Sequence, residues 1–149
     1  MLDYQTLDNI ADAYTPALLF TCLLLVAQSC VKKKWQKATK QAALLIYGIT
    51  LTYSLMFLDL YVKIWPSFDL DYSTHSAAAL VLVIFLINSL SSTKLFWLFS
   101  LVSYFLLMLY QQYHSLADII TTSLVILVFM LPVSHKLAPA FNTSPTGKL

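Results

Sequence analysis

The chain has 149 residues, of which 59% are hydrophobic and 11% are charged, and its mean hydropathy is +0.74. Soluble domains carry about 25% charged residues, so the composition excludes an ordinary soluble domain and predicts an integral membrane protein with little mass outside the bilayer. The net charge is only +2, but every basic residue is a lysine and the chain has no arginine.

The N-terminal stretch from Leu2 to Tyr14 is the first predicted element. Its charged residues are all acidic, so it lacks the positive start of a secretory signal peptide. Its apolar residues loosely share one face, which predicts a short amphipathic helix on the membrane surface. The residues on that face are Leu2, Leu7, Ile10 and Ala11.

Five apolar segments follow, and each predicts a membrane-spanning helix. They cover residues 15–31, 42–61, 76–90, 95–110 and 116–132. Several are shorter than the roughly 20 residues of a spanning helix, so we expect flanking aromatic and lysine residues to extend them. Residues 138–149 are polar and proline-containing, which predicts a disordered cytoplasmic tail. The predicted fold is an all-α bundle of about five transmembrane helices, in a single domain over residues 1–137.

The lysines orient this predicted bundle. Most lie in the loop between the first and second segments, in the loop between the third and fourth, or after the fifth. Because lysines concentrate in cytoplasmic loops, the N-terminus is expected outside and the C-terminus inside, with Lys63 as the exception. The lysines of these three regions are Lys32, Lys33, Lys34, Lys37 and Lys40, then Lys94, then Lys136 and Lys148.

Two short polar segments lie where hydrophobic segments meet water. They are Ser73-Thr74-His75-Ser76 and His114-Ser115-Leu116-Ala117-Asp118. One crossing and one return separate them, so both histidines are expected at the outer end of the bundle, close together. Ionisable groups at membrane depth usually mark a function or a specific pair.

The second polar segment has the residue types for nucleophilic chemistry. If the fifth helix starts near Gln112, His114 and Asp118 share one face with about 5–6 Å between their Cβ atoms. The carboxylate would then fix one imidazole tautomer and leave the other nitrogen as a nucleophile or base. Ser73 or Thr74 would cap the next helix start, where free N–H groups favour an anion. A metal site and a purely structural, interfacial role for the histidines remain alternatives.

These segments resemble two motifs of the type 2 phosphatidic acid phosphatase superfamily of membrane lipid phosphatases. The family's Pro-Ser-Gly-His motif corresponds to Tyr72-Ser73-Thr74-His75, and its His-x-x-x-Asp ending corresponds to His114 through Asp118. The resemblance covers residues 59–122. It implies that His114 attacks phosphorus and forms a phosphohistidine, that Asp118 orients it, and that His75 protonates the leaving group.

The family's first motif, a Lys, six further residues and then Arg-Pro, has no match; the nearest stretch is Lys63-Ile64-Trp65-Pro66. Phosphate binding is therefore expected from Lys63, Ser73 and Thr74. A divergent lipid phosphatase, a headgroup phosphotransferase, a non-catalytic subunit or pseudoenzyme that binds a lipid headgroup, and a metal-dependent membrane enzyme stay open. We expect a lipid phosphate substrate and membrane lipids as partners, and no cofactor, metal or nucleic acid. The expected location is a bacterial cytoplasmic membrane, with the site facing the periplasm or exterior.

Overall fold

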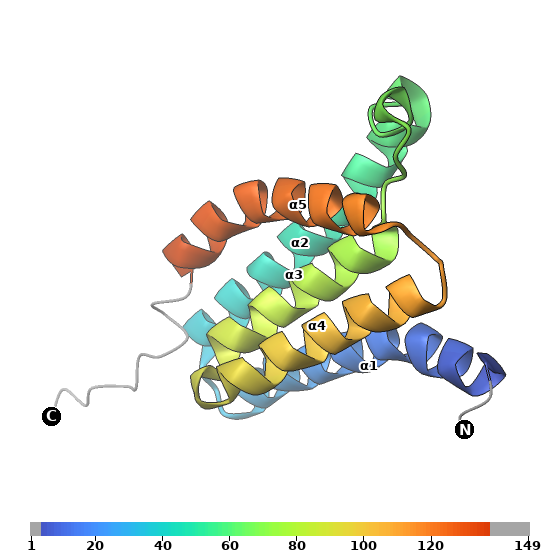
Figure 1. The fold of residues 1–149 in the computed structure, drawn as a ribbon. Coiled ribbons are helices and arrows are strands. Elements are labelled where there is room, and N and C mark those ends of the chain that lie inside the picture. Colours follow the sequence, from blue (N-terminus) through green and yellow to red (C-terminus); the bar gives the residue numbers. More distant parts are fainter. Residues whose placement is uncertain (1–3, 138–149) are drawn as a thin grey trace, which may run out of the picture.

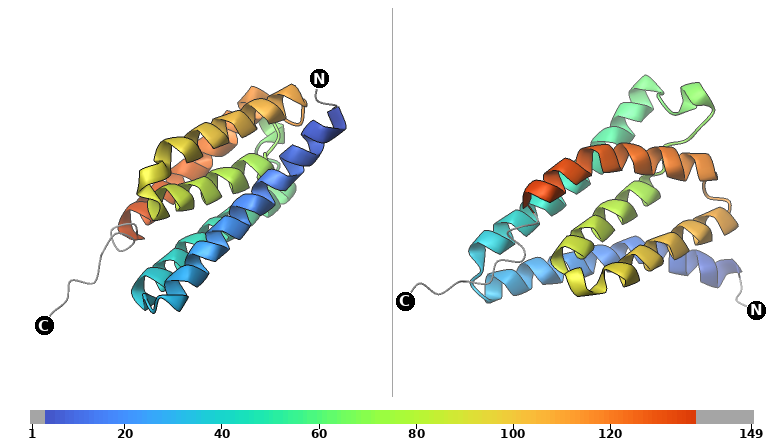
Figure 2. Two further views of the ribbon diagram at one scale, coloured as in Figure 1. Left: turned by 90° about the horizontal axis from the view of Figure 1, so that it is seen from below. Right: turned by 60° about the vertical axis from the view of Figure 1, so that its left-hand side comes forward.

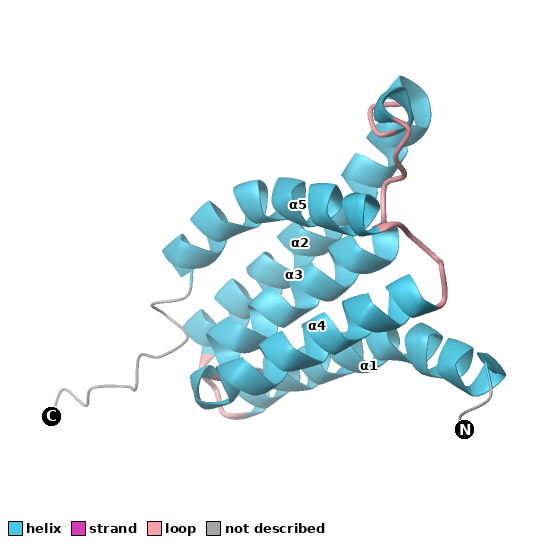
Figure 3. Cartoon of the chain, viewed as in Figure 1, coloured by secondary structure: helices cyan, strands magenta, loops and turns pink. Residues whose placement is uncertain are grey.

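The computed structural model describes residues 4–137, which fold into five α-helices joined by short loops (Figure 1). The helices are α1 (Tyr4–Val31), α2 (Trp35–Val62), α3 (Thr74–Ser89), α4 (Lys94–Tyr110) and α5 (Leu116–Leu137), with short 3-10 helices η1 (Pro66–Phe68) and η2 (Ser91–Thr93). The part of the chain described contains no strand (Figure 3), so the predicted all-α class is confirmed. The predicted tail at 138–149 lies outside the described residues.

Helix α3 occupies the centre of the bundle and contacts all four other helices (Figure 1). The eight consecutive residues 79–86 are all buried. Their sequence, Ala-Leu-Val-Leu-Val-Ile-Phe-Leu, is apolar on every side of a helix, and such a helix is stable only when other elements surround it. The core of the molecule therefore lies along α3.

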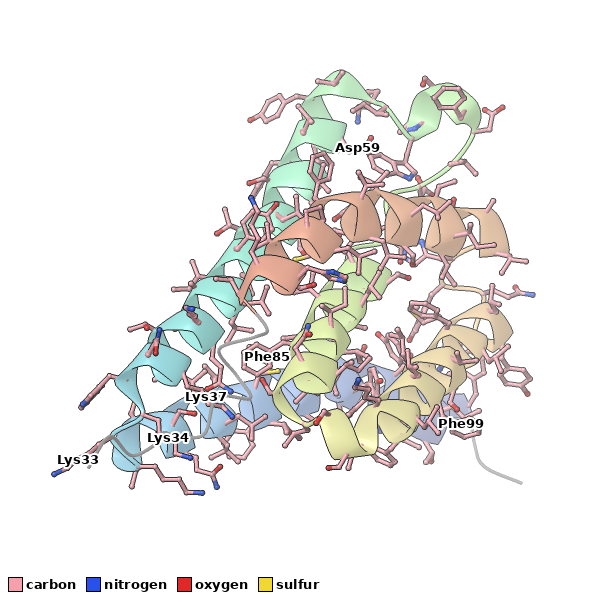
Figure 4. All side chains as sticks on the ribbon, turned by 90° about the vertical axis from the view of Figure 1, so that its left-hand side faces the viewer. Lys33, Lys34, Lys37, Asp59, Phe85 and Phe99 are labelled. Atoms are coloured by element: carbon pink, nitrogen blue, oxygen red, sulfur yellow. The ribbon has the colours of Figure 1, made fainter. Side chains whose placement is uncertain are left out.

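The other four helices are long and apolar enough to cross a membrane. Three of them are α1, α2 and α5, and the fourth combines η2 with α4 as Ser91–Tyr110. Helix α3 has only 16 residues, or about 24 Å at 1.5 Å per residue, which is less than the roughly 30 Å hydrocarbon core. Large apolar side chains such as Phe99 on α4 (Figure 4) and Val128 on α5 are exposed on the outside of the bundle, as expected of lipid-facing helices.

The N-terminal stretch does not form a separate surface helix, contrary to the prediction. Helix α1 runs without interruption from Tyr4 to Val31, with Pro16 inside it. Contacts with α4 and the residue after it hold this stretch along the bundle. Tyr4 Oη donates to the Gln111 carbonyl at 3.0 Å, and the Tyr14 ring stacks on Tyr104 with centroids 4.2 Å apart.

Helix α2 begins at Trp35, seven residues before the predicted segment at 42. A buried polar network holds Gln41, the residue just before the predicted segment, inside the bundle. Gln41 is 1% exposed, and its Oε1 accepts from Ser29 Oγ of α1 at 2.7 Å while its Nε2 donates to Ser89 Oγ of α3 at 3.2 Å. Hydropathy excluded Gln41 from the apolar segment, but these bonds satisfy its amide inside the bundle.

The lysine-rich loop and the predicted site lie at opposite ends of the bundle. Figure 4 shows Lys33, Lys34 and Lys37 where α1 and α2 meet, with Asp59 far away near the other end of α2. The starts of α3 and α5 lie at the Asp59 end, beside the segment that projects above the bundle in Figure 1. A second orientation shows the same arrangement (Figure 2).

Candidate functional site

Ser73 caps the N-terminal end of α3 and links it to α5 by a hydrogen bond. It is the N-cap residue, with φ −88° and ψ 92°, and its Oγ accepts from the Ser76 amide at 3.3 Å. The Ser73 and Ser76 hydroxyls are 2.8 Å apart, and the Ser73 amide donates to Thr122 Oγ1 at 3.1 Å. Ser73 is completely buried. The predicted capping role is thus present, but the hydroxyl predicted to bind substrate points into the protein.

Ser115 and Asp118 form a capping box at the start of α5. The Asp118 amide donates to Ser115 Oγ at 3.2 Å, and the Ser115 amide donates to Asp118 Oδ2 at 2.8 Å. This reciprocal pair satisfies two backbone groups that a helix start leaves free. The helix therefore begins at Leu116 rather than near Gln112, and His114 lies in the loop before it. The predicted placement of His114 and Asp118 on one helical face is wrong for this reason.

The second oxygen of Asp118 links the two polar segments. Asp118 Oδ1 accepts from the Asp71 amide at 2.8 Å. Asp118 is 6% exposed, so both of its oxygens are engaged by backbone N–H groups in a largely buried setting. Within residues 4–137, His114 has no hydrogen bond to this carboxylate. Asp118 thus affects the His114 imidazole through its negative charge and by holding the loop before α5 in position.

The two histidines differ in environment. His75 is exposed in the first turn of α3, and His114 is half-buried. Burial lowers the pKa of His114 below the usual 6.5; the Asp118 carboxylate opposes this, His75 adds to it, and Asp71 opposes it. His75, Asp71 and Asp118 are therefore close enough to His114 to influence its titration. At neutral pH the His114 imidazole is uncharged, with a lone pair free on one nitrogen.

The predicted phosphate-binding residues are not all brought to this cluster. Thr74 is half-buried as the first residue of α3, next to His75. Lys63 is exposed at the C-terminal end of α2, in a left-handed conformation, and its amide donates to the Asp59 carbonyl at 2.8 Å. No hydrogen bond or ion pair in the described residues joins Lys63 to either histidine.

Contacts of Trp65, which was not predicted as a site residue, attach the projecting segment to the bundle. The Trp65 amide donates to Asp59 Oδ1 at 2.9 Å, and its indole Nε1 donates to Thr121 Oγ1 of α5 at 3.1 Å. The Trp65 ring meets Tyr72 edge-on with centroids 5.0 Å apart. These contacts hold in position residues 71–73, which lead into α3. Thr121 and Thr122 follow Asp118 at the three- and four-residue spacings of one helix face, which is the sequence signal that could have found them.

No three His, Cys, Asp or Glu side chains of residues 4–137 are grouped closely enough to hold a metal ion. No family model, curated protein or solved structure matches this chain. The resemblance to the phosphatase superfamily therefore has only the quoted motifs to support it.

Proposed function

We propose that this protein is a membrane lipid phosphatase or headgroup phosphotransferase that acts on a phosphorylated lipid at the histidine end of the bundle. The observation that carries the proposal is the hydrogen bond from the Asp71 amide to Asp118 Oδ1. It joins the segment before His75 to the segment after His114, and His75 contributes to the lowered pKa of His114. Their surroundings are a bundle whose exposed helices are apolar enough for a membrane.

The proposed reaction has two displacements. The free nitrogen of His114 attacks phosphorus, the P–O bond to the lipid breaks, and protonated His75 gives its proton to the leaving oxygen. Water, or the hydroxyl of an acceptor, then gives a proton to His75 and attacks the phosphohistidine, which releases phosphate or the new ester and restores His114. A neutral imidazole suits the first step, because burial keeps His114 unprotonated at pH 7.

The phosphate oxygens are proposed to meet the free N–H groups at the start of α3 and the Thr74 hydroxyl. Helix starts favour anions because their first N–H groups have no partner within the helix. The chain has no arginine, and loss of one preorganised donor typically lowers a rate by about 10²–10³. We therefore expect slow turnover. Asp118 is a positioning residue here, since its oxygens bind backbone amides.

The proposal is tested with His114→Ala, which should abolish phosphate release from lipid phosphates and pyrophosphates in detergent. His135→Ala, which changes an exposed histidine near the far end of α5, is the matched control and should keep the wild-type rate. A wild-type rate that falls as the pH drops through a midpoint below 6.5 would agree with His114 as the nucleophile, because protonation removes its lone pair. If wild-type protein released no phosphate from any of a broad set of lipid phosphates and pyrophosphates, the proposal would be contradicted.

A non-catalytic membrane subunit that binds a lipid headgroup is the second candidate. The structure favours it in one respect, since both oxygens of Asp118 are occupied by backbone amides and neither is hydrogen-bonded to His114. In that case His75→Ala and His114→Ala would leave the cellular phenotype intact. Substitutions on an exposed helix face would abolish it.

A further inference from the structure

A groove in the apolar part of the molecule lies on the side of α3 that also carries His75. Helices α1 and α2 diverge from the lysine-rich loop toward the histidine end (Figures 2 and 4). A cavity of about 90 Å³ lies between them. Its walls come from residues 15–19 of α1 and 49–53 of α2, and its floor is formed by Ala78, Val81 and Leu82 of α3.

The floor of this groove is a face of α3 that α1 and α2 leave partly uncovered. Ala78 is half-buried, while Ala77 and Ala79 on either side of it are completely buried. His75 is exposed and lies three residues before Ala78, so the two share one side of the helix. Leu82, four residues after Ala78, continues this side and is buried. Exposure along this face therefore decreases from His75, which is exposed, through Ala78, which is half-buried, to Leu82, which is buried.

The groove also opens sideways. Ile49 and Tyr53 of its α2 wall are 36% and 47% exposed, and both lie in a helix that is long and apolar enough to span a membrane. The surface of the cavity is mostly apolar. An apolar opening in the side of a membrane helix bundle faces lipid tails rather than water.

We propose that this groove holds one acyl chain of the lipid whose phosphate is placed at His75 and His114. This inference rests on the proposed function and adds to it the place where the hydrocarbon tail of the lipid binds. The cavity has room for about three water volumes, which corresponds to a short stretch of a single narrow chain. The tail enters the groove from surrounding lipid or detergent rather than from water, so its affinity comes from packing against the groove walls. Affinity should thus rise with tail length only until the groove is full.

The first test uses Ala78→Phe, which fills the groove, with Ala43→Phe on the exposed surface of α2 as the matched control. Ala78→Phe should raise KM for a long-chain lipid phosphate by about tenfold or more relative to KM for p-nitrophenyl phosphate, which has no tail. Ala43→Phe should change neither. Equal KM values for the long-chain substrate in wild type and Ala78→Phe would overturn the acyl-chain groove while leaving phosphatase activity in place.

The second test requires no enzymatic activity and no substitution in the groove. A lipid phosphate with a diazirine in its acyl chain is photo-crosslinked to wild-type and His114→Ala protein in detergent, and the labelled peptides are mapped. Labelling concentrated on residues 49–53 and 78–82 supports the groove. This holds even if the protein hydrolyses nothing, because a lack of hydrolysis would contradict only the proposed reaction. Labelling spread evenly over the exposed faces of α4 and α5 would overturn the groove.

Discussion

Within residues 4–137, four residues with left-handed backbone conformations lie at the ends of helices, and none of them is glycine. Lys33, Lys63, Asp69 and Gln112 have φ between 54° and 58°. After α4, the Gln112 amide donates to the Leu109 carbonyl at 3.1 Å and the Tyr113 amide donates to the Met108 carbonyl at 3.1 Å, which is the Schellman pattern. Glycine normally occupies such a position because a Cβ atom is unfavourable there.

We therefore expect Gln112→Gly to stabilise the protein by about 1 kcal/mol, since it removes that unfavourable Cβ atom. The control is Gln28→Gly, which makes the same replacement at an exposed position with ordinary helical conformation in α1. It should destabilise by roughly 1 kcal/mol. Thermal unfolding in detergent measures both. If Gln112→Gly lowered the melting temperature as much as Gln28→Gly, this account of the turn would be wrong.

Ser115 and Asp118 show why one residue pattern predicts two roles. Ser-x-x-Asp before an apolar run is a capping-box pattern, and His-x-x-x-Asp also resembles a catalytic motif. The catalytic interpretation requires the fifth helix to start near Gln112, whereas the apolar segment itself starts at residue 116. In the structure the capping interaction is present, with Asp118 bound to the Ser115 amide at 2.8 Å. Local hydrogen bonding at the helix start decided the position of His114.

At the level of elements, the contact between α2, α3 and α5 depends on Gly48. A Cβ atom at this position would overlap Val81 Cγ1 of α3 and lie 3.3 Å from Met130 Cε of α5. Small residues allow membrane helices to approach closely. Valine has few alternative rotamers in a helix, so Val81 cannot readily turn away.

Gly48→Ala is accordingly expected to destabilise the protein by about 1–3 kcal/mol through overpacking, despite the higher helix propensity of alanine. Val81→Ala removes the atom that the new Cβ would meet. The double variant should therefore lose less stability than the sum of the two single variants. Additive losses in a thermal unfolding experiment would show that the overlap is not the cause.

Most lysines lie at one end of the described molecule and most aspartates at the other, with Lys63 as the exception. The exposed lysines Lys32, Lys33 and Lys34 lie in the α1–α2 connection, whereas Asp59, Asp71 and Asp118 lie at the other end with both predicted histidines. Lysine-rich connections usually remain in the cytoplasm. We propose on this basis that the histidine end faces the outside of the cell, as expected from the sequence.

Cysteine labelling tests this orientation. In a background in which Cys22 and Cys30 are replaced by alanine, Tyr113→Cys should react with a membrane-impermeant maleimide in intact cells. Ser91→Cys, at the lysine end, should react only after lysis. Both positions are exposed in the folded chain. The reverse pattern would place the histidine end in the cytoplasm.

The sequence alone determined the all-α class and the approximate positions of the apolar helices, because hydropathy over a window of residues is a local property. It also placed Ser73 at a helix start, since N-cap preferences are local. Only the tertiary structure decided that Asp118 binds the Asp71 amide, that Ser73 is buried against Thr122, and that α3 is enclosed by its neighbours. These features depend on which helices pack together. The meeting of the two histidine segments was predicted from the number of crossings between them, but the bonds that hold those segments together were not.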